Sequence, residues 1–163
     1  MDALELPPEN PPAPVSGRYD GGKHLYPVRV FFEDTDLSGV VYHANYLRWF
    51  ERARSDMLRL LGIEQRAAHD AGEGAYAVSE LTIRYLRPAR LDDAVVVQSG
   101  VSELAAASCR ITQQAWRGTE LLAESTVRVA FVNPQGRPRR QPAHWVEAIR
   151  QLLTQSNGNE TQP

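Results

Sequence analysis

Residues 33–54 read EDTDLSGVVYHANYLRWFERAR, and this stretch decides how the chain is interpreted. Two acids, Asp34 and Asp36, lie in a turn-forming run that ends at Gly39. His43 follows shortly after, just before a predicted amphipathic helix. A carboxylate and an imidazole seven residues apart at the start of a helix form a plausible site for hydrolysing an ester or a thioester.

Length and composition predict a single soluble globular domain. The 163 residues can bury one sizeable core, and 42% hydrophobic with 23% charged residues is ordinary for such a protein. A net charge of -2 gives no bulk attraction to nucleic acid or anionic lipid. Cys109 is the only cysteine, which excludes an intrachain disulfide and fits a reducing compartment. With neither a secretory signal nor an apolar run of about 20 residues, the expected location is the cytoplasm.

The two ends of the chain are expected to lie outside the folded unit. Residues 1–24 are rich in proline and glycine, and this composition predicts a disordered tail. Residues 156–163 are polar and predict a flexible C-terminal tail. The domain itself is predicted over residues 25–155.

Within the domain, residue patterns predict two helices and several strands. β-branched and aromatic runs predict strands at 26–33, 76–86, 94–104, 108–116 and 120–133. Apolar residues at helical spacing predict helices over 45–61, ended by Gly62, and over 143–153. Short connections among the last three strands predict antiparallel hairpins. The order of these elements predicts an α+β fold, with one long helix against an antiparallel sheet.

The segment from Arg29 to Arg54 closely resembles the hotdog-fold acyl-CoA thioesterases. The most similar group is the YbgC-type enzymes associated with the Tol-Pal system, and 4-hydroxybenzoyl-CoA thioesterase is a more distant relative. The match is carried by Arg29, Val30, Thr35, Asp36, Gly39, Val40, Val41, Tyr42, Asn45 and Tyr46. The resemblance implies a long central helix wrapped by a curved antiparallel sheet of five strands. It also implies a homodimer joined at the sheet edges, or a homotetramer built as a dimer of dimers.

The resemblance assigns the catalytic part to Asp36 and His43. Asp36 matches the family's catalytic aspartate, which could attack the thioester carbonyl or activate a water. The alternative to a catalytic role is a purely structural one, in which Asp36 only caps a turn, as we expect for Asp34. The His43 side chain could polarise the carbonyl or protonate the leaving thiolate. Its backbone N–H, at the positive end of the helix, could stabilise the developing oxyanion, and we favour this second role.

Other residues of the segment are expected to bind substrate or to support the loop. The substrate-binding set comprises Gly39, Val40, Val41, Tyr42, Asn45, Tyr46, Arg84 and Arg87. For Tyr46, as for Phe50, a place in the core is the simpler interpretation. Gly39 is expected to allow a backbone conformation or a close approach that a Cβ would block. Glu51 lies among arginines, and an ion-paired helix face explains it better than catalysis.

The phosphates of coenzyme A should meet basic residues. The candidates are Arg84, Arg87 and Arg90, together with Arg137, Arg139 and Arg140. The distant relative places basic residues in the turn between the third and fourth strands, but here that turn, residues 102–108, reads SELAAAS. The donor could therefore be an acyl carrier protein instead of free coenzyme A.

The sequence contains no motif for a metal or a redox cofactor, so we expect hydrolysis without a cofactor. The leading hypothesis is a thioesterase that acts on short-chain or aromatic acyl-CoA. The alternative is a scaffold that binds acyl carrier protein or envelope-biogenesis partners with little turnover. A related dehydratase matches the segment less well.

Overall fold

In the computed structural model, the protein is described over residues 9–158, with side chains up to residue 156. The first eight residues of the predicted N-terminal tail and the last five of the predicted C-terminal tail lie outside this range. The helices are α1 (His43–Leu60), α2 (Gln65–Asp70) and α3 (Ala143–Gly158), and a 3-10 turn, η1, covers Phe32–Asp34. The strands are β1 (Arg18–Asp20), β2 (Lys23–Arg29), β3 (Ala75–Tyr85), β4 (Ala94–Leu104), β5 (Ser108–Arg117) and β6 (Glu120–Val132).

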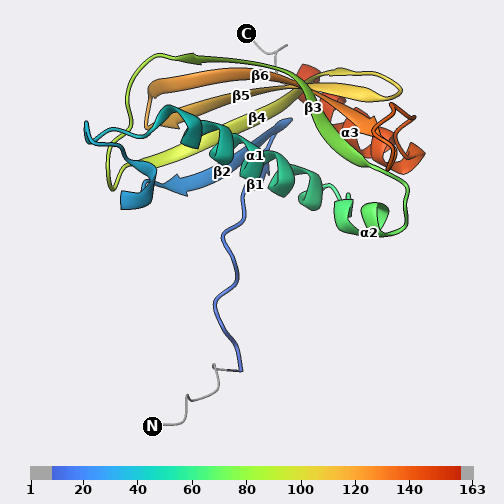
Figure 1. Ribbon diagram of the computed structural model, residues 1–163, viewed down its shortest axis with the longest axis horizontal. Coiled ribbons are helices and arrows are strands. Elements are labelled where there is room, and N and C mark those ends of the chain that lie inside the picture. The colour runs from blue at the N-terminus through green and yellow to red at the C-terminus, as the bar shows by residue number, and fades with distance from the viewer. Residues whose placement is uncertain (1–8, 159–163) are drawn as a thin grey trace.

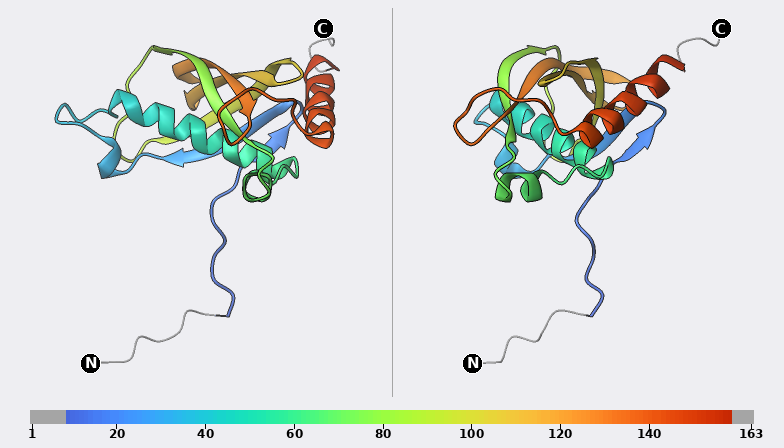
Figure 2. Two further views of the ribbon diagram at one scale, coloured as in Figure 1. Left: turned by 45° about the vertical axis from the view of Figure 1, so that its right-hand side comes forward. Right: turned by 90° about the vertical axis from the view of Figure 1, so that its right-hand side faces the viewer.

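The strands form one antiparallel sheet in the order β1-β2-β4-β5-β6-β3. Helix α1 runs along one face of this curved sheet, and α2 and α3 lie at the end of the molecule where α1 finishes (Figure 1). Residues 9–13 extend away from the body below α1 (Figure 2), and the Ser16 hydroxyl donates to Asp56 Oδ1 on that helix (2.9 Å). The predicted α+β architecture and the predicted hairpins β4-β5 and β5-β6 are confirmed. Within residues 9–158, no helix combines the length and the apolar character needed to cross a membrane.

The sheet contains six strands where five were expected. The additional strand, β1, falls inside the predicted tail, so the folded unit begins near residue 18 instead of residue 25. Its cause is the Gly21–Gly22 pair, which forms a two-residue hairpin turn with Gly21 at φ 57° and lets Tyr19 pair with His24. At the other end, α3 continues into the predicted C-terminal tail as far as Gly158.

The other differences lie at the ends of predicted elements. The strand expected at 26–33 ends at Arg29, because residues 32–34 form η1. The Asp34 side chain accepts a hydrogen bond from the Phe31 N–H (2.8 Å), which favours a turn over the β propensity of the two phenylalanines. The short helix α2 occupies part of the stretch between 63 and 74, where no element was expected. Gly62 follows the last turn of α1 with φ 76°, as expected for a helix C-terminus.

The core consists of two apolar clusters beneath α1. One surrounds Phe50 and Trp49 near the start of the helix, and the other surrounds Met57 and Phe131 near its end. Of the apolar residues at helical spacing on α1, Tyr46, Phe50, Ala53 and Met57 are buried, whereas Leu60 at the end of the helix is 44% exposed. Trp49, at 1% exposure, is covered as well. Burying side chains of this size stabilises the fold by roughly 1.5–3 kcal/mol each.

A transverse polar row separates the two clusters. Paired positions on β2, β4, β5 and β6 place His24, Ser99, Gln113 and Ser125 side by side on the face covered by α1. Helix α1 contributes two buried charged residues to this row. Arg54 Nη1 donates to Gln113 Oε1 (2.7 Å), and Asp56 bonds with the His24 ring (2.7 Å).

Candidate active site

The loop of residues 31–42, here called the Asp36 loop, turns tightly around Asp36. The Asp36 N–H donates to the Val40 carbonyl oxygen (2.9 Å), and the Gly39 N–H donates to the Asp36 carbonyl oxygen (3.0 Å). Gly39 has φ 79°, a left-handed conformation that glycine adopts without the cost of a Cβ. No heavy atom lies within 4 Å of a Cβ built at this position, so backbone conformation, not crowding, requires the glycine.

The Asp36 carboxylate is exposed and held by one neighbour. Its Oδ1 accepts hydrogen bonds from the Ser38 N–H (2.8 Å) and the Ser38 hydroxyl (2.5 Å). These two bonds, with smaller contributions from the Val40 backbone and from the charge of His43, outweigh the effect of burial and hold the pKa of Asp36 below its usual value. Within residues 9–158, Oδ2 has no hydrogen-bond partner. At neutral pH the site therefore presents an ionised carboxylate with one oxygen open to solvent or substrate.

Asp34 has a structural part, as expected. Its side chain accepts the Phe31 N–H, and its carbonyl oxygen accepts both the Tyr42 N–H and Asn45 Nδ2 (2.8 Å each). These bonds close the Asp36 loop onto the first turn of α1. Of the two acids in the motif, Asp34 therefore supports the loop and Asp36 faces solvent.

Helix α1 begins at His43, directly after the loop. Among residues 9–158, no carbonyl oxygen accepts the N–H of His43 or of Ala44, while the Asn45 N–H bonds to the Tyr42 carbonyl oxygen (2.9 Å). Free N–H groups at the positive end of a helix attract a developing negative charge. The His43 ring is exposed and lies 4.4 Å from the Tyr42 ring, measured between centroids.

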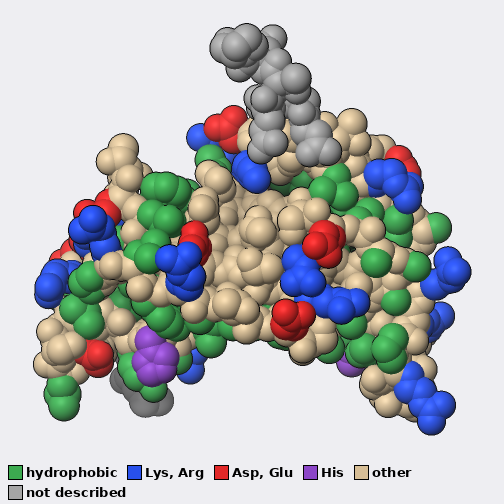
Figure 3. All heavy atoms as spheres, turned by 90° about the horizontal axis from the view of Figure 1, so that it is seen from above, with side chains coloured by type: hydrophobic (Ala, Val, Ile, Leu, Met, Phe, Trp, Pro, Cys, Tyr) green, Lys and Arg blue, Asp and Glu red, His purple; other side chains and the backbone are tan. Residues whose placement is uncertain are grey.

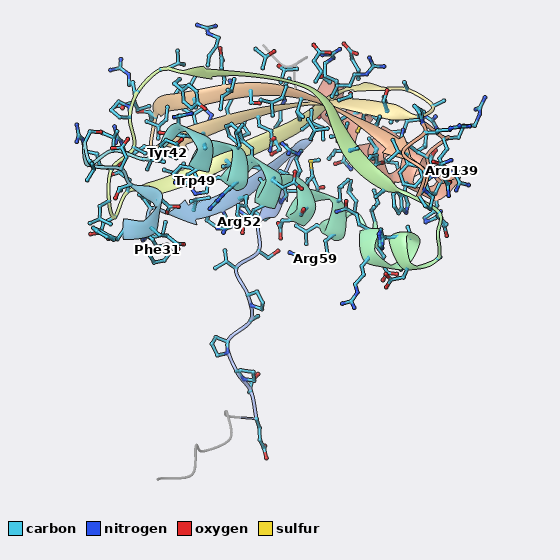
Figure 4. The ribbon with its side chains drawn as sticks, in the orientation of Figure 1. Phe31, Tyr42, Trp49, Arg52, Arg59 and Arg139 are labelled. Atoms are coloured by element: carbon cyan, nitrogen blue, oxygen red, sulfur yellow. The ribbon has the colours of Figure 1, made fainter. Side chains whose placement is uncertain are left out.

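β3 supplies a further contact to this helix start. The Tyr85 hydroxyl donates to the His43 carbonyl oxygen (2.9 Å), and the two rings meet edge to face at 6.2 Å. Tyr85 also contacts the ring of Tyr46 at 5.5 Å. The aromatic residues thus surround the beginning of α1. Figure 4 shows Phe31 and Tyr42 at this same end of the molecule.

Several residues expected to bind substrate are buried within the chain. Val41, Asn45 and Tyr46 are each less than a tenth exposed, and Val40 is half-buried. The Val41 N–H donates to the Ala89 carbonyl oxygen (2.8 Å), and the Tyr46 hydroxyl accepts the Ala89 N–H (3.1 Å). In this chain Val41, Asn45 and Tyr46 hold the loop, while Gly39 and Tyr42 have exposed surface.

The candidate arginines do not gather at the site within one chain. Arg84 precedes Tyr85 in β3 and therefore points to the opposite face of the sheet. There it pairs with Glu124 (2.9 Å) and lines a polar hollow of about 440 Å³. Figure 3 shows the sheet from this side, where neither hydrophobic nor charged side chains dominate the middle of the face. Arg87 is exposed just after β3, whereas Arg139 lies at the far end of the molecule (Figure 4).

Two residues of the site were missed by sequence reasoning. Ser38 could have been found, because a serine two residues after an aspartate commonly bonds to its side chain in a turn. Tyr85 gave no local signal, since it is 42 residues from His43 in sequence and only the sheet brings it there. Residues 9–158 contain no cluster of three or more side chains suited to a metal ion.

Comparison with known proteins identifies the family and the fold of the chain. Residues 38–124 match the thioesterase superfamily. An acyl-CoA thioesterase YbgC of Haemophilus influenzae is 44% identical over 108 residues, covering 66% of this chain and 79% of that protein. An acyl-CoA thioester hydrolase YbgC of Escherichia coli O6:H1 is 40% identical over 128 residues, covering 77% and 95%.

A solved structure extends the similarity to three dimensions. A probable thioesterase from Bartonella henselae superposes with a TM-score of 0.71 at 36% identity, covering 74% of this chain and 99% of that one. The expected family and fold are both confirmed. The chain belongs to the thioesterase superfamily, has the hotdog fold and is a thioester hydrolase of the YbgC group.

Proposed function

We propose that this protein hydrolyses acyl-CoA thioesters to a free acid and coenzyme A, with Asp36 as the reacting carboxylate. The observation that carries the proposal is the pairing of an exposed, ionised carboxylate with unbonded N–H groups at the start of α1. The first supplies a nucleophile or a base, and the second supplies positive charge where an oxyanion would form. The curated relatives named above are acyl-CoA thioesterases, which supports this substrate class.

The chemistry follows from these two groups. The thioester carbonyl oxygen is placed at the His43 N–H, which stabilises the negative charge that develops there. Asp36 then follows one of two routes. Either it attacks the carbonyl carbon, expels the thiolate and forms a mixed anhydride that water cleaves, or it takes a proton from a water that attacks directly. In both routes the carbon–sulfur bond breaks, water supplies the hydroxyl of the acid, and the thiolate acquires a proton.

The side chains around the start of α1 suggest which acyl groups the protein prefers. The rings of Tyr42, His43 and Tyr85 are close to one another and partly exposed. Such rings favour a flat or short acyl group over a long chain that needs a deep channel. We therefore place short-chain or aromatic acyl-CoA among the preferred substrates, with Gly39 and Tyr42 in contact with substrate and the exposed Arg87 near the phosphates.

The active unit is proposed to be a homodimer or a homotetramer. β3 forms an edge of the sheet and exposes Val78 (52%), Leu81 (36%) and Tyr85 (45%) along its length. An exposed edge with apolar side chains is suited to pairing with the same strand of a second copy. This would place the start of α1 beside the partner subunit.

Cys109 is a buried free thiol, which supports a reducing cytoplasmic location.

Thiol release from a panel of acyl-CoA esters tests the proposal. The wild-type protein should release coenzyme A from short-chain or aromatic esters, and Asp36→Asn should lose most of that activity. Normal turnover by correctly folded Asp36→Asn would exclude the proposed role of this residue.

A second candidate is a scaffold for acyl carrier protein or envelope-biogenesis partners. It is favoured by the turn of residues 102–108, which contains no lysine or arginine for coenzyme A phosphates. Stoichiometric carrier protein bound to the purified chain, together with negligible thiol release over the whole panel, would support the scaffold instead.

A further inference from the structure

The Asp36 loop rests against the connection between β3 and β4, residues 86–93. Val40 and Arg90 form an antiparallel bridge, and the Val41 N–H donates to the Ala89 carbonyl oxygen (2.8 Å). Val40 in turn accepts the Asp36 N–H at 2.9 Å. The backbone that carries Asp36 is thus joined to residues 89–90 through Val40 and Val41.

An ion pair between Asp93 and Arg117 holds the connection of residues 86–93 against the end of β5. Asp93 Oδ2 accepts the Arg90 N–H (2.9 Å) and Arg117 Nη1 (2.6 Å). The same nitrogen of Arg117 lies 3.3 Å from the Pro88 carbonyl oxygen, and Nη2 bonds to Glu120 Oε1 at 2.6 Å. Arg117 is the last residue of β5, so it connects residues 88–93 to the rigid centre of the sheet.

The pair is partly shielded from water and is charged. The side chains of Arg117 and Asp93 are 33% and 23% exposed, which makes their bond stronger than a fully exposed one. Burial acts to raise the pKa of Asp93, but the bonds from Arg90 and Arg117 outweigh it and hold the pKa below its usual value. The neighbouring Asp92 has φ 67°, a costly conformation for a residue with a side chain.

Further backbone bonds hold this strained turn. The Asp92 N–H donates to the Val30 carbonyl oxygen, and the Val30 N–H donates to the Asp93 carbonyl oxygen (3.0 Å each). Strain of this kind persists only where the surroundings determine the conformation, and it concentrates at functional sites. Residues 86–93 therefore form a stiff support behind the Asp36 loop.

We propose that Asp93 and Arg117 are positioning residues for Asp36: their ion pair sets residues 88–90, and these residues set the backbone of the Asp36 loop through Val40 and Val41. The inference rests on the proposed function, since it assumes that Asp36 reacts. Neither residue of the pair is assigned contact with substrate. Small displacements of a reacting group lower catalysis steeply, while ground-state binding is less affected.

The test compares kcat and KM of four variants with those of wild type. Asp93→Asn and Arg117→Gln should each lower kcat about 10- to 100-fold with KM little changed. Arg117→Lys keeps the charge and should recover part of kcat. The acid limb of the pH profile should not move, because Ser38, not Asp93, bonds to the Asp36 carboxylate. Arg150→Gln is the matched control, since it breaks an ion pair of 2.9 Å with Glu147 on α3.

Each outcome decides the question. An unchanged kcat in folded Asp93→Asn and Arg117→Gln overturns the inference, and so does a loss shared by Arg150→Gln or a loss that matches the fraction unfolded by urea titration. If neither variant folds, or if Arg117→Lys is no better than Arg117→Gln, the pair acts in folding and the inference is also overturned. Asp36→Asn, assayed in parallel, separates the two proposals: if it retains activity, the proposed function fails first.

Discussion

The polar row beneath α1 gives a sharp prediction about stability, centred on Gln113. Its side chain is fully buried and makes three hydrogen bonds. Oε1 accepts Arg54 Nη1 (2.7 Å), and Nε2 donates to the Phe50 carbonyl oxygen (3.0 Å) and to Ser99 Oγ (2.9 Å). Replacing it by leucine keeps a similar volume and removes all three bonds.

The magnitude follows from the kind of bond that is lost. Two bonds between neutral groups contribute about 1 kcal/mol each, and the bond from the charged Arg54 contributes about 1.5–3 kcal/mol. The apolar side chain of Gln113→Leu recovers roughly 1 kcal/mol. We therefore expect the free energy of unfolding to fall by about 2.5–4 kcal/mol. Arg54 would keep its bond to Glu51 but lose its only partner on the sheet among residues 9–158.

Urea unfolding at a fixed protein concentration measures this loss, because the concentration of subunits affects the stability of an oligomer. A double-mutant cycle with Arg54→Met should give a coupling of about 1.5–3 kcal/mol, since the double variant leaves no buried charge facing an apolar side chain. A loss below about 0.5 kcal/mol for Gln113→Leu, or strictly additive effects, would refute the reasoning about the polar row.

Three further predictions concern the Asp36 loop and the N-terminal hairpin. Ser38→Ala removes the hydroxyl bond that lowers the pKa of Asp36 most and leaves the bond from the N–H of residue 38 in place. Because activity is lost as pH falls through that pKa, the acid limb of kcat/KM should move to higher pH, and an unmoved limb in the pH profile contradicts this. Gly39→Ala should lower the free energy of unfolding by about 1 kcal/mol and lower kcat/KM, because residue 39 has φ 79°, which alanine adopts only with strain. A urea midpoint and a kcat/KM equal to those of wild type would contradict this prediction. Asp56→Ala removes the partner of buried His24 and should speed limited proteolysis of the β1-β2 hairpin; cleavage at the wild-type rate would count against this contact.

The sequence predicted the regular elements well where local pattern and burial agree. The strand expected at 94–104 coincides with β4, and α1 begins two residues before its expected start. β1 escaped prediction because proline and glycine dominate the surrounding composition, and the Gly21–Gly22 turn was not recognised as a hairpin signal.

The site was predictable in part. The family resemblance separated Asp34 from Asp36, which the spacing of the two acids alone did not, and Asp34 supports the loop as expected. The contacts of Tyr85 with His43 and of Arg117 with Asp93 join residues far apart in the chain. They depend on the register of the sheet, which no local pattern in the sequence specifies.

The most direct test of the central claim compares Asp36→Asn with Asp34→Asn in a thiol-release assay on acyl-CoA. Both variants lie in the same loop and remove one charge, and the asparagine oxygen at position 34 can still accept the Phe31 N–H. Equal unfolding midpoints would establish that both proteins are folded. The proposed mechanism predicts a loss of kcat/KM of about 10²- to 10⁴-fold for Asp36→Asn and little change for Asp34→Asn. Comparable activity of the two variants would contradict it.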